Sequence, residues 1–399
     1  MSDKKKQAVF SYHSSLIKDM NVESTLAELV RIDSRSSISN VEVIKHVLPR
    51  IEAAGLCARM FPYTDECGVK KFNLVAVHPA SLADGDRVEL ALVGHTDTVP
   101  FDPAWTEARA LTERDGKLYG RGACDTKGFI AAALTAVEEA DVRHLARPFA
   151  LVLTADEEVG CLGAKRLAEA KPYRVRHAVV GEPTSLRPMR AGKGYCLAEV
   201  IVRGREGHSA YPHLGASAIT RAARLVTRVE AVAEELKRDA HKAFDPPHTT
   251  VNVGLIAGGT AKNIIAGECR FTLEWRPVPG QRPEHVAELI RREIDALRAE
   301  DESFDCDLFV TRLDGGMETA ADAPLVVALE EATGRAAGTV AFGTEAPQLA
   351  ELGADAVVFG PGDIRVAHRT GEFVPAAELR EAVPILRRTI ERFCAGEHQ

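Results

Sequence analysis

The sequence predicts an α/β protein in which a doubly wound, mostly parallel sheet is interrupted by an inserted α+β segment of split-βαβ, ferredoxin-like order. Two observations support this prediction. In both terminal parts of the chain, short apolar runs alternate with helical stretches, which is typical of a parallel sheet covered on both faces. Between about residues 190 and 315 the order becomes strand, helix, two strands, helix, strand. We therefore expect two domains, one from residues 1–189 with 316–399 and one from residues 190–315.

The individual elements follow from the spacing of apolar residues. Residues 22–56 have apolar side chains three and four positions apart and predict helix. In the remainder of the larger domain we expect strands at 88–93, 149–154, 178–180 and 356–359, helices at 129–140, 163–170 and 376–394, and further elements at 325–331 and 339–342. In the inserted segment we expect strands at 196–203, 249–255, 268–275 and 305–313, and helices at 216–238 and 284–300.

Composition excludes several classes of protein. The 399 residues are 45% hydrophobic and 27% charged, as in globular proteins with a sizeable core. A net charge of −8 disfavours nucleic acid and anionic membranes as partners. The eight cysteines include no Cys-x-x-Cys pair, so neither a thiolate zinc site nor a redox motif is predicted. No apolar run approaches the ~20 residues of a membrane span, and the basic start Met1–Lys6 leads into polar residues, so we expect a cytoplasmic protein.

Acidic and histidine residues follow four of the expected strands. His95 and Asp97 follow the first, Asp156–Glu158 the second, Glu182 the third, and His368 comes shortly after the fourth. Ligands of open α/β sheets bind beyond the carboxyl ends of the strands, so these side chains are expected to face one crevice.

So many carboxylates buried together require a cation, because each unpaired buried charge costs several kcal/mol. Imidazole and carboxylate ligands without cysteine suit zinc, cobalt or manganese, and their number favours two ions about 3.5–4 Å apart. On extended backbone His95 and Asp97 project to the same side, so one can bind metal while the other orients it. Glu157 and Glu158 project to opposite sides, so one would bind metal and the other would act as general base. Spacing does not decide which residue of either pair has which role.

Six motifs in order resemble the co-catalytic zinc amidohydrolase and exopeptidase family, over roughly residues 20–395. They are Gly94–Pro100, Tyr119–Gly128, Asp156–Gly160, Gly181–Thr184, Gly207–Ser209 and Gly343–Ala346. The resemblance implies one metal held by His95, Asp125 and Glu182, and a second held by Asp125, Glu158 and His368. It further implies that Glu157 is the base and that Asp97 orients His95.

The resemblance also implies roles for the inserted domain. This domain would form a homodimer, and His208 would reach the partner subunit's site to stabilise the oxyanion. Asn263 and Arg276 would contact the substrate carboxylate, a task that suits a guanidinium fork.

The implied reaction is hydrolysis of the amide bond of an N-acyl amino acid. The run Gly343–Pro347 resembles the members that deacetylate acetylornithine, and desuccinylases carry a Ser-Asp pair at that place. We therefore expect Thr344 and Glu345 at the substrate, with Glu345 near the cationic side chain of N2-acetylornithine, an intermediate of arginine biosynthesis. Succinyl-diaminopimelate, acetylcitrulline and dipeptides remain alternative substrates. Thr126, where Met is usual, and Thr370–Phe373, where many relatives have Pro-Asp-Glu, also leave the substrate open.

Each of these residues taken alone has an ordinary interpretation, and their joint placement carries the prediction. Histidines such as His13 and His398 are assigned no role. A nucleotide-binding protein is disfavoured, because Asp125 replaces the third glycine after Gly120-Arg121-Gly122 and would repel a pyrophosphate. A catalytically inactive binding homologue is disfavoured, because all five expected ligands and Glu157 are present.

Overall fold

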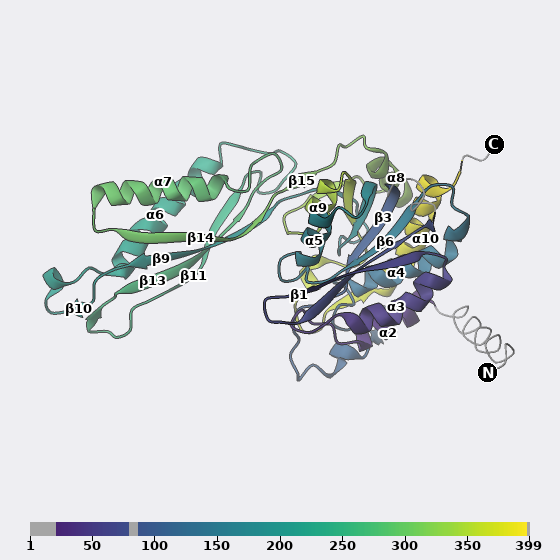
Figure 1. Cartoon of the computed structure of the whole chain (residues 1–399), viewed down its shortest axis with the longest axis horizontal. Coiled ribbons are helices and arrows are strands. Elements are labelled where there is room, and N and C mark those ends of the chain that lie inside the picture. Colours follow the sequence, from purple (N-terminus) through teal and green to yellow (C-terminus); the bar gives the residue numbers. More distant parts are fainter. Residues whose placement is uncertain (1–20, 80–86, 397–399) are drawn as a thin grey trace. The chain divides into compact units, whose positions relative to one another are not determined.

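The computed structural model describes residues 21–79 and 87–396, which form two compact units with the elements labelled in Figure 1. The first unit comprises the described parts of Met1–Arg190 and Thr344–Gln399, together with Thr319–Gly338. The second comprises Ala191–Glu318 and Thr339–Gly343. Residues 316–318 and 339–343, expected in the larger domain, belong to the second unit. Met1–Lys6, His13 and His398 lie outside the described residues.

The largest sheet in the described part of the chain is mixed. Its order is β1-β2-β6-β3-β7-β17-β8-β15, with β16 beside β8. Only the central strands β6, β3, β7 and β17 run parallel, and each of the other pairings along this order is antiparallel. The expectation of a mostly parallel sheet is therefore wrong outside these four strands. The strands are β1 (Cys57–Thr64), β2 (Lys70–Val77), β3 (Arg87–His95), β6 (Phe149–Thr154), β7 (Arg174–Gly181), β8 (Met189–Gly192), β15 (Met317–Glu318), β16 (Gly338–Val340) and β17 (Asp355–Phe359).

Helices cover both faces of this sheet, as β6 illustrates. Successive strand residues point to opposite faces. Phe149, Leu151 and Leu153 join the main core, which includes α2 (Val22–Arg31), α3 (Val41–Ala53), α4 (Lys127–Glu139), α8 (Pro324–Thr333) and α10 (Ala376–Cys394). The alternate residues of β6 face α5 (Leu162–Ala170) and α9 (Ala346–Glu351), which contact each other. The expectation of a sheet covered on both faces is confirmed for β6.

Several elements differ from the sequence-based prediction. The helix expected at 22–56 is two helices, because residues 32–40 leave the helix and Ser36 donates a hydrogen bond to Asp97. The antiparallel strands β1 and β2 were not expected. A second sheet, in the order β18-β5-β4, was also missed; it consists of β18 (Phe373–Pro375), β5 (Lys117–Tyr119) and β4 (Thr112–Arg114). Short 3-10 helices occur at Thr106–Arg109, Val142–His144, Pro212–Leu214 and Ile364–Val366.

The second unit is a four-stranded antiparallel sheet, in the order β11-β13-β9-β14, with α6 and α7 side by side along one face (Figure 1). In β13 alternate residues, among them Phe271 and Trp275, are buried in a core that includes residues of both helices. In chain order the elements are β9 (Tyr195–Arg203), β10 (Gly207–His208), α6 (Ala218–Leu236), β11 (Thr250–Gly258), β12 (Ile264–Ile265), β13 (Glu268–Arg276), α7 (His285–Glu300) and β14 (Asp305–Asp314). In the described residues, no helix is long and apolar enough to cross a membrane.

Candidate metal centre and active site

The carboxyl ends of the parallel strands deliver the expected residues to one edge of the sheet. His95 at the end of β3 pairs in register with Thr154 at the end of β6, and Gly181 at the end of β7 pairs with Phe359 of β17. Glu182 follows Gly181 directly. A side chain at Gly181 would place its Cβ 2.1 Å from the Phe129 ring, so the close approach of α4 requires glycine at this position.

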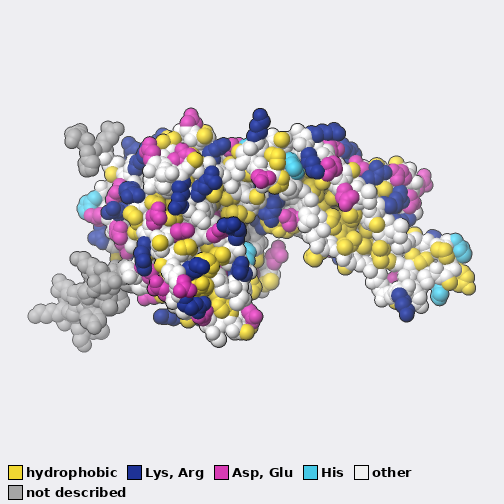
Figure 2. Space-filling model, turned by 180° about the vertical axis from the view of Figure 1, so that it is seen from behind, with side chains coloured by type: hydrophobic (Ala, Val, Ile, Leu, Met, Phe, Trp, Pro, Cys, Tyr) yellow, Lys and Arg dark blue, Asp and Glu magenta, His cyan; other side chains and the backbone are white. Residues whose placement is uncertain are grey.

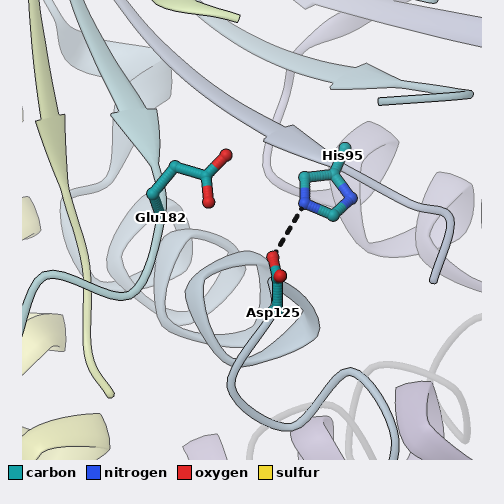
Figure 3. A group of neighbouring side chains, drawn as sticks. All are labelled: His95, Asp125 and Glu182. Carbon is teal, nitrogen blue, oxygen red and sulfur yellow. Dashed lines mark hydrogen bonds and ion pairs between the residues drawn. The ribbon is translucent and has the colours of Figure 1, made fainter. Parts of the chain in front are cut away.

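Two groups of potential metal ligands meet at this edge. His95, Asp125 and Glu182 form one group, and Asp125, Glu158 and His368 form the other. Within each group the ligand atoms lie within 4.8 Å of one another. Figure 3 shows the first group, in which the Glu182 carboxylate points toward the space beside His95 and Asp125. Asp125 belongs to both groups, so its carboxylate is placed to bridge two ions.

The two histidines are oriented by specific contacts. His95 Nδ1 lies 3.1 Å from the Asp97 carbonyl oxygen, which leaves Nε2 directed at Asp125 Oδ1, also 3.1 Å away. His368 Nε2 lies 3.1 Å from Asp125 Oδ2 and 3.0 Å from Glu158 Oε2. His368 has a φ of 59°, a left-handed conformation that is uncommon for residues other than glycine and clusters at functional sites.

Glu157 and Glu158 lie in the turn after β6, so the assumption of extended backbone at this pair is wrong. The Asp97 carboxylate accepts the backbone N–H groups of Glu157 (3.1 Å) and Glu158 (3.2 Å) and the Ser36 hydroxyl (2.7 Å). Its Oδ1 is 3.6 Å from His95 Nδ1. Asp97 therefore holds the turn that carries the two glutamates and also lies beside the ring of His95.

A buried ion pair anchors the same turn from behind. Lys71, 1% exposed, lies on β2 and donates to Asp156 Oδ1 (2.7 Å) and to the carbonyl of Ile38 (3.0 Å). The Tyr63 hydroxyl donates to Asp156 Oδ2 (2.8 Å). Since Asp156 immediately precedes Glu157, these contacts fix the start of the turn.

The electrostatics of the cluster favour a bound cation. Burial, reinforced by the charge of Asp125, raises the pKa of Glu182 well above its usual value and also raises the pKa of Glu158. Burial would raise the pKa of Asp125 as well, but hydrogen bonds from His368 and His95 outweigh it and hold that pKa below its usual value. Without a cation, burial shifts Glu182 and Glu158 toward their protonated forms, and divalent cations would stabilise the charged forms of the same groups.

Glu157 has the environment of a general base. It is placed beside the ligand groups without belonging to either. Burial and then the neighbouring charges of Glu158, Glu345 and Asp125 raise its pKa to about 8, although the charge of His95 opposes this shift. The Cys161 thiol donates to Glu157 Oε1 at 3.3 Å. A carboxylate with a pKa near neutrality can both accept and return a proton.

Glu345 is a further buried carboxylate of the first unit. It is 1% exposed, its Oε2 accepts the Thr154 hydroxyl (2.9 Å), and its Oε1 has no hydrogen-bond partner among the described residues. Burial raises its pKa to about 7 against the opposing charge of His95. The hydroxyl of neighbouring Thr344 accepts the Ala346 N–H (3.2 Å).

Thr126 is buried in the same unit, and its hydroxyl donates to the carbonyl of His95 (3.1 Å).

The remaining expected residues lie in the second unit. His208 is on β10 and Asn263 directly precedes β12, two strands that pair with each other. The N–H of Ser209, the residue after His208, donates to the Asn263 carbonyl (3.1 Å), so His208 and Asn263 lie close together. Arg276, at the end of β13, lies over the Tyr195 ring at 4.5 Å and donates to Glu274 Oε1 (2.8 Å).

Several residues that support the site could not be recognised from the sequence. These are Ser36, Lys71, Arg121, Cys161 and Glu372. Ser36 and Lys71 stand on segments far from the motifs, whereas Arg121 lies within the motif Tyr119–Gly128 and Cys161 directly follows Asp156–Gly160, where nothing in the local sequence shows their contacts. A weak signal existed for Glu372, because this charged residue lies four positions after an expected ligand and directly precedes the apolar strand β18.

The sheet and the two ligand groups, with the buried carboxylate of Glu157 beside them, indicate a metal-dependent hydrolase. More specifically, the chain belongs to peptidase family M20/M25/M40, whose family model matches residues 91–392. The family resemblance noted in the sequence is thereby confirmed.

Known proteins are similar over nearly the whole chain. Acetylornithine deacetylase from Myxococcus xanthus is 55% identical over 376 residues, which cover 94% of this chain and 98% of that protein. Acetylornithine deacetylase from Proteus mirabilis (strain HI4320) is 35% identical over 92% of this chain and 93% of that protein. Among solved structures, the aminopeptidase PepT from Bacillus cereus aligns with a TM-score of 0.73 over 93% of this chain and 98% of that chain, at 22% identity. At that identity the likeness shows the fold alone.

Proposed function

We propose that this protein hydrolyses N2-acetylornithine to ornithine and acetate, a reaction of arginine biosynthesis. The observation that carries the hydrolytic chemistry is the Asp125 carboxylate, shared by two ligand groups with Glu157 beside them. The similarity to proteins named acetylornithine deacetylase supports the choice of substrate.

The proposal includes two divalent ions, zinc in the first place, with cobalt or manganese as alternatives. His95, Asp125 and Glu182 would hold one ion, and Asp125, Glu158 and His368 the other. Two features fit this role. The buried carboxylates of Glu182 and Glu158 have raised pKa values and would be stabilised in their charged form by a cation. A set of imidazole and carboxylate ligands without sulfur also suits the metals named above. When bound, the ions would lower the pKa of the attacking water and polarise the acyl carbonyl.

The protein's own residues would move the proton. Glu157 would accept a proton from the water while the water oxygen attacks the acetyl carbonyl carbon. It would then donate that proton to the leaving amine as the C–N bond breaks. Asp97 would keep Glu157 in place through the backbone N–H that its carboxylate accepts. Acetate and the free amine of ornithine are the products.

The second unit would contribute oxyanion stabilisation and substrate binding. In the proposed homodimer, His208 of one subunit would stabilise the oxyanion in the site of the other, and Asn263 and Arg276 would bind the substrate carboxylate. Exposed apolar side chains on the smaller unit support an interface between two copies (Figure 2). They include Tyr211, Leu214, Ile219, Leu255, Ile256 and Ile264.

Glu345 and Thr344 would complete the substrate site. The unpartnered Oε1 of Glu345 would accept a hydrogen bond from the side-chain ammonium of N2-acetylornithine. Succinyl-diaminopimelate, acetylcitrulline and dipeptides are the alternative substrates. A cytoplasmic location stays a prediction from the sequence.

A hydrolysis screen with metal analysis tests the proposal. Purified protein would be assayed with N2-acetylornithine, acetylcitrulline, acetylmethionine, succinyl-diaminopimelate and dipeptides, and its metal content would be measured by atomic absorption. We expect two ions per chain and the highest kcat/KM with N2-acetylornithine. Another preferred substrate would refute the choice of substrate, whereas absence of bound metal and of all hydrolysis would indicate the inactive binding homologue. Sedimentation equilibrium tests the dimer.

A further inference from the structure

Glu372 is a buried carboxylate that the proposed reaction does not use. It is 1% exposed, and its Oε1 accepts the backbone N–H groups of Cys124 (2.9 Å) and Asp125 (3.0 Å). Its Oε2 accepts a hydrogen bond from Arg121 Nη1 at 2.6 Å. Glu372 thus binds the main chain of the residue whose carboxylate belongs to both ligand groups.

Arg121 is itself held in place. Its side chain is nearly buried and lies over the Trp105 ring, with Cζ 5.4 Å from the ring centroid. Its backbone N–H donates to the Ala108 carbonyl at 2.8 Å. The guanidinium therefore reaches Glu372 from a fixed position, and its charge compensates a carboxylate that would otherwise be buried close to Asp125 without a cation.

The same residue connects the two segments that supply Asp125 and His368. Glu372 follows His368 by four positions, and its carbonyl accepts the Gly120 N–H (3.1 Å). The next residues form β18, which pairs with β5 just before Gly120. The contacts of Glu372 therefore join these segments through both its backbone and its side chain.

We propose that Glu372 and Arg121 are positioning residues of the metal centre, which hold the Asp125 carboxylate in register with His95 and His368. This inference rests on the metal binding proposed above. Hydrogen-bond partners of metal ligands typically contribute 10- to 100-fold to metal affinity or activity, because they fix the orientation of the ligand and raise its basicity. The Glu372 carboxylate does not contact the ligand atoms of Asp125 but accepts its backbone N–H.

A buried ion pair could instead serve only the stability of the fold, and the chain offers a matched control for that alternative. Arg50 donates to both carboxylate oxygens of Glu138, at 2.7 and 2.8 Å. This pair also lies in the first unit and joins α3 to α4, and within the described ranges none of its hydrogen bonds involves a ligand residue. Glu138→Gln should therefore reduce stability without changing metal affinity.

The test is metal titration of the full-length protein. Wild type, Glu372→Gln, Arg121→Lys and Glu138→Gln would be stripped with a chelator and titrated with Zn²⁺ by calorimetry and with Co²⁺ by visible absorption. We expect Glu372→Gln to raise the metal dissociation constant by at least tenfold and to alter the Co²⁺ spectrum. Arg121→Lys keeps the charge but loses the planar fork, so we expect a smaller rise. Excess Zn²⁺ should restore most of the activity of both variants.

The outcomes separate this inference from the proposed function. Wild-type metal affinity in both Glu372→Gln and Arg121→Lys would overturn the positioning role, and so would an equal loss of affinity in Glu138→Gln. If Glu372→Gln does not fold, Arg121→Lys decides the question by the same titration. Failure of the wild-type protein to bind Zn²⁺ or Co²⁺ would instead refute the proposed metal centre.

Discussion

Replacement of Glu345 by Gln tests the proposed substrate most directly. The substitution keeps the size of the side chain and an oxygen that can accept the Thr154 hydroxyl, but it removes the negative charge. In the part of the chain that the structure describes, Oε1 of Glu345 has no hydrogen-bond partner, and the side chain is 1% exposed. A substrate ammonium that reaches this oxygen would therefore form a hydrogen bond to a desolvated carboxylate.

The expected magnitude follows from this geometry. Hydrogen bonds to charged groups contribute about 1.5–3 kcal/mol, and each 1.4 kcal/mol corresponds to roughly tenfold. Glu345→Gln should therefore lower the preference for N2-acetylornithine over N-acetylnorvaline by about 10- to 150-fold. N-acetylnorvaline has the same side-chain carbons without the amine, so its kcat/KM should change little.

The assay measures kcat/KM for both substrates at saturating metal, in wild type and variant. Glu351→Gln is a matched control, because it removes an exposed carboxylate at the other end of α9. An unchanged ratio of the two kcat/KM values in Glu345→Gln would refute the assignment of Glu345 to the substrate side chain. An equal loss with both substrates would assign Glu345 to the chemistry instead.

Four further predictions follow from the same contacts. Glu157→Gln should lower kcat by about 10²- to 10⁴-fold with unchanged metal content, because it removes the base and leaves the ligands; steady-state kinetics and atomic absorption check this. Removal of bound metal by a chelator should lower the melting temperature, and added Zn²⁺ should restore it, because the carboxylates lose their counter-charge; differential scanning fluorimetry measures the shift. Lys71→Met should lower the free energy of unfolding in urea by about 3–5 kcal/mol, since Asp156 then loses its buried partner; a change below about 1 kcal/mol would contradict this. In metal-free protein, Glu345 has a pKa near 7 and binds a proton more tightly in the folded than in the unfolded state. The free energy of unfolding of wild type should therefore fall by about 3 kcal/mol relative to that of Glu345→Gln as the pH rises from 4.5 to 7. Parallel profiles of unfolding free energy against pH for the two proteins would exclude this effect.

Local patterns in the sequence predicted much of the fold. The strand at 149–154 and the helix at 376–394 have the bounds that the apolar spacing indicates. A strand or helix that buries one face has apolar residues at regular spacing along the sequence, so it can be recognised without the fold. The direction and partners of a strand are not encoded in this way, which is why the antiparallel parts of the sheet were not foreseen. The edge strand β1 was missed because none of its residues is buried, so its sequence lacks an apolar pattern.

In the candidate site as well, the sequence showed some residues and the structure alone showed the contacts that hold them. His95, Asp97, Glu157, Glu158 and Glu182 were recognisable from the sequence because each follows an apolar strand, and parallel strands end at a common edge. Their supporting contacts were not recognisable, because Ser36 and Asp97 are 61 residues apart, Lys71 and Asp156 are 85 apart, and Glu372 and Asp125 are 247 apart. Spacing thus indicated that these side chains, together with His368, could meet at one edge of the sheet, whereas Asp125 and the division of roles came from the family resemblance. Only tertiary structure decided what holds them, because a hydrogen bond between distant segments depends on how the whole chain packs and leaves no trace in the neighbouring residues.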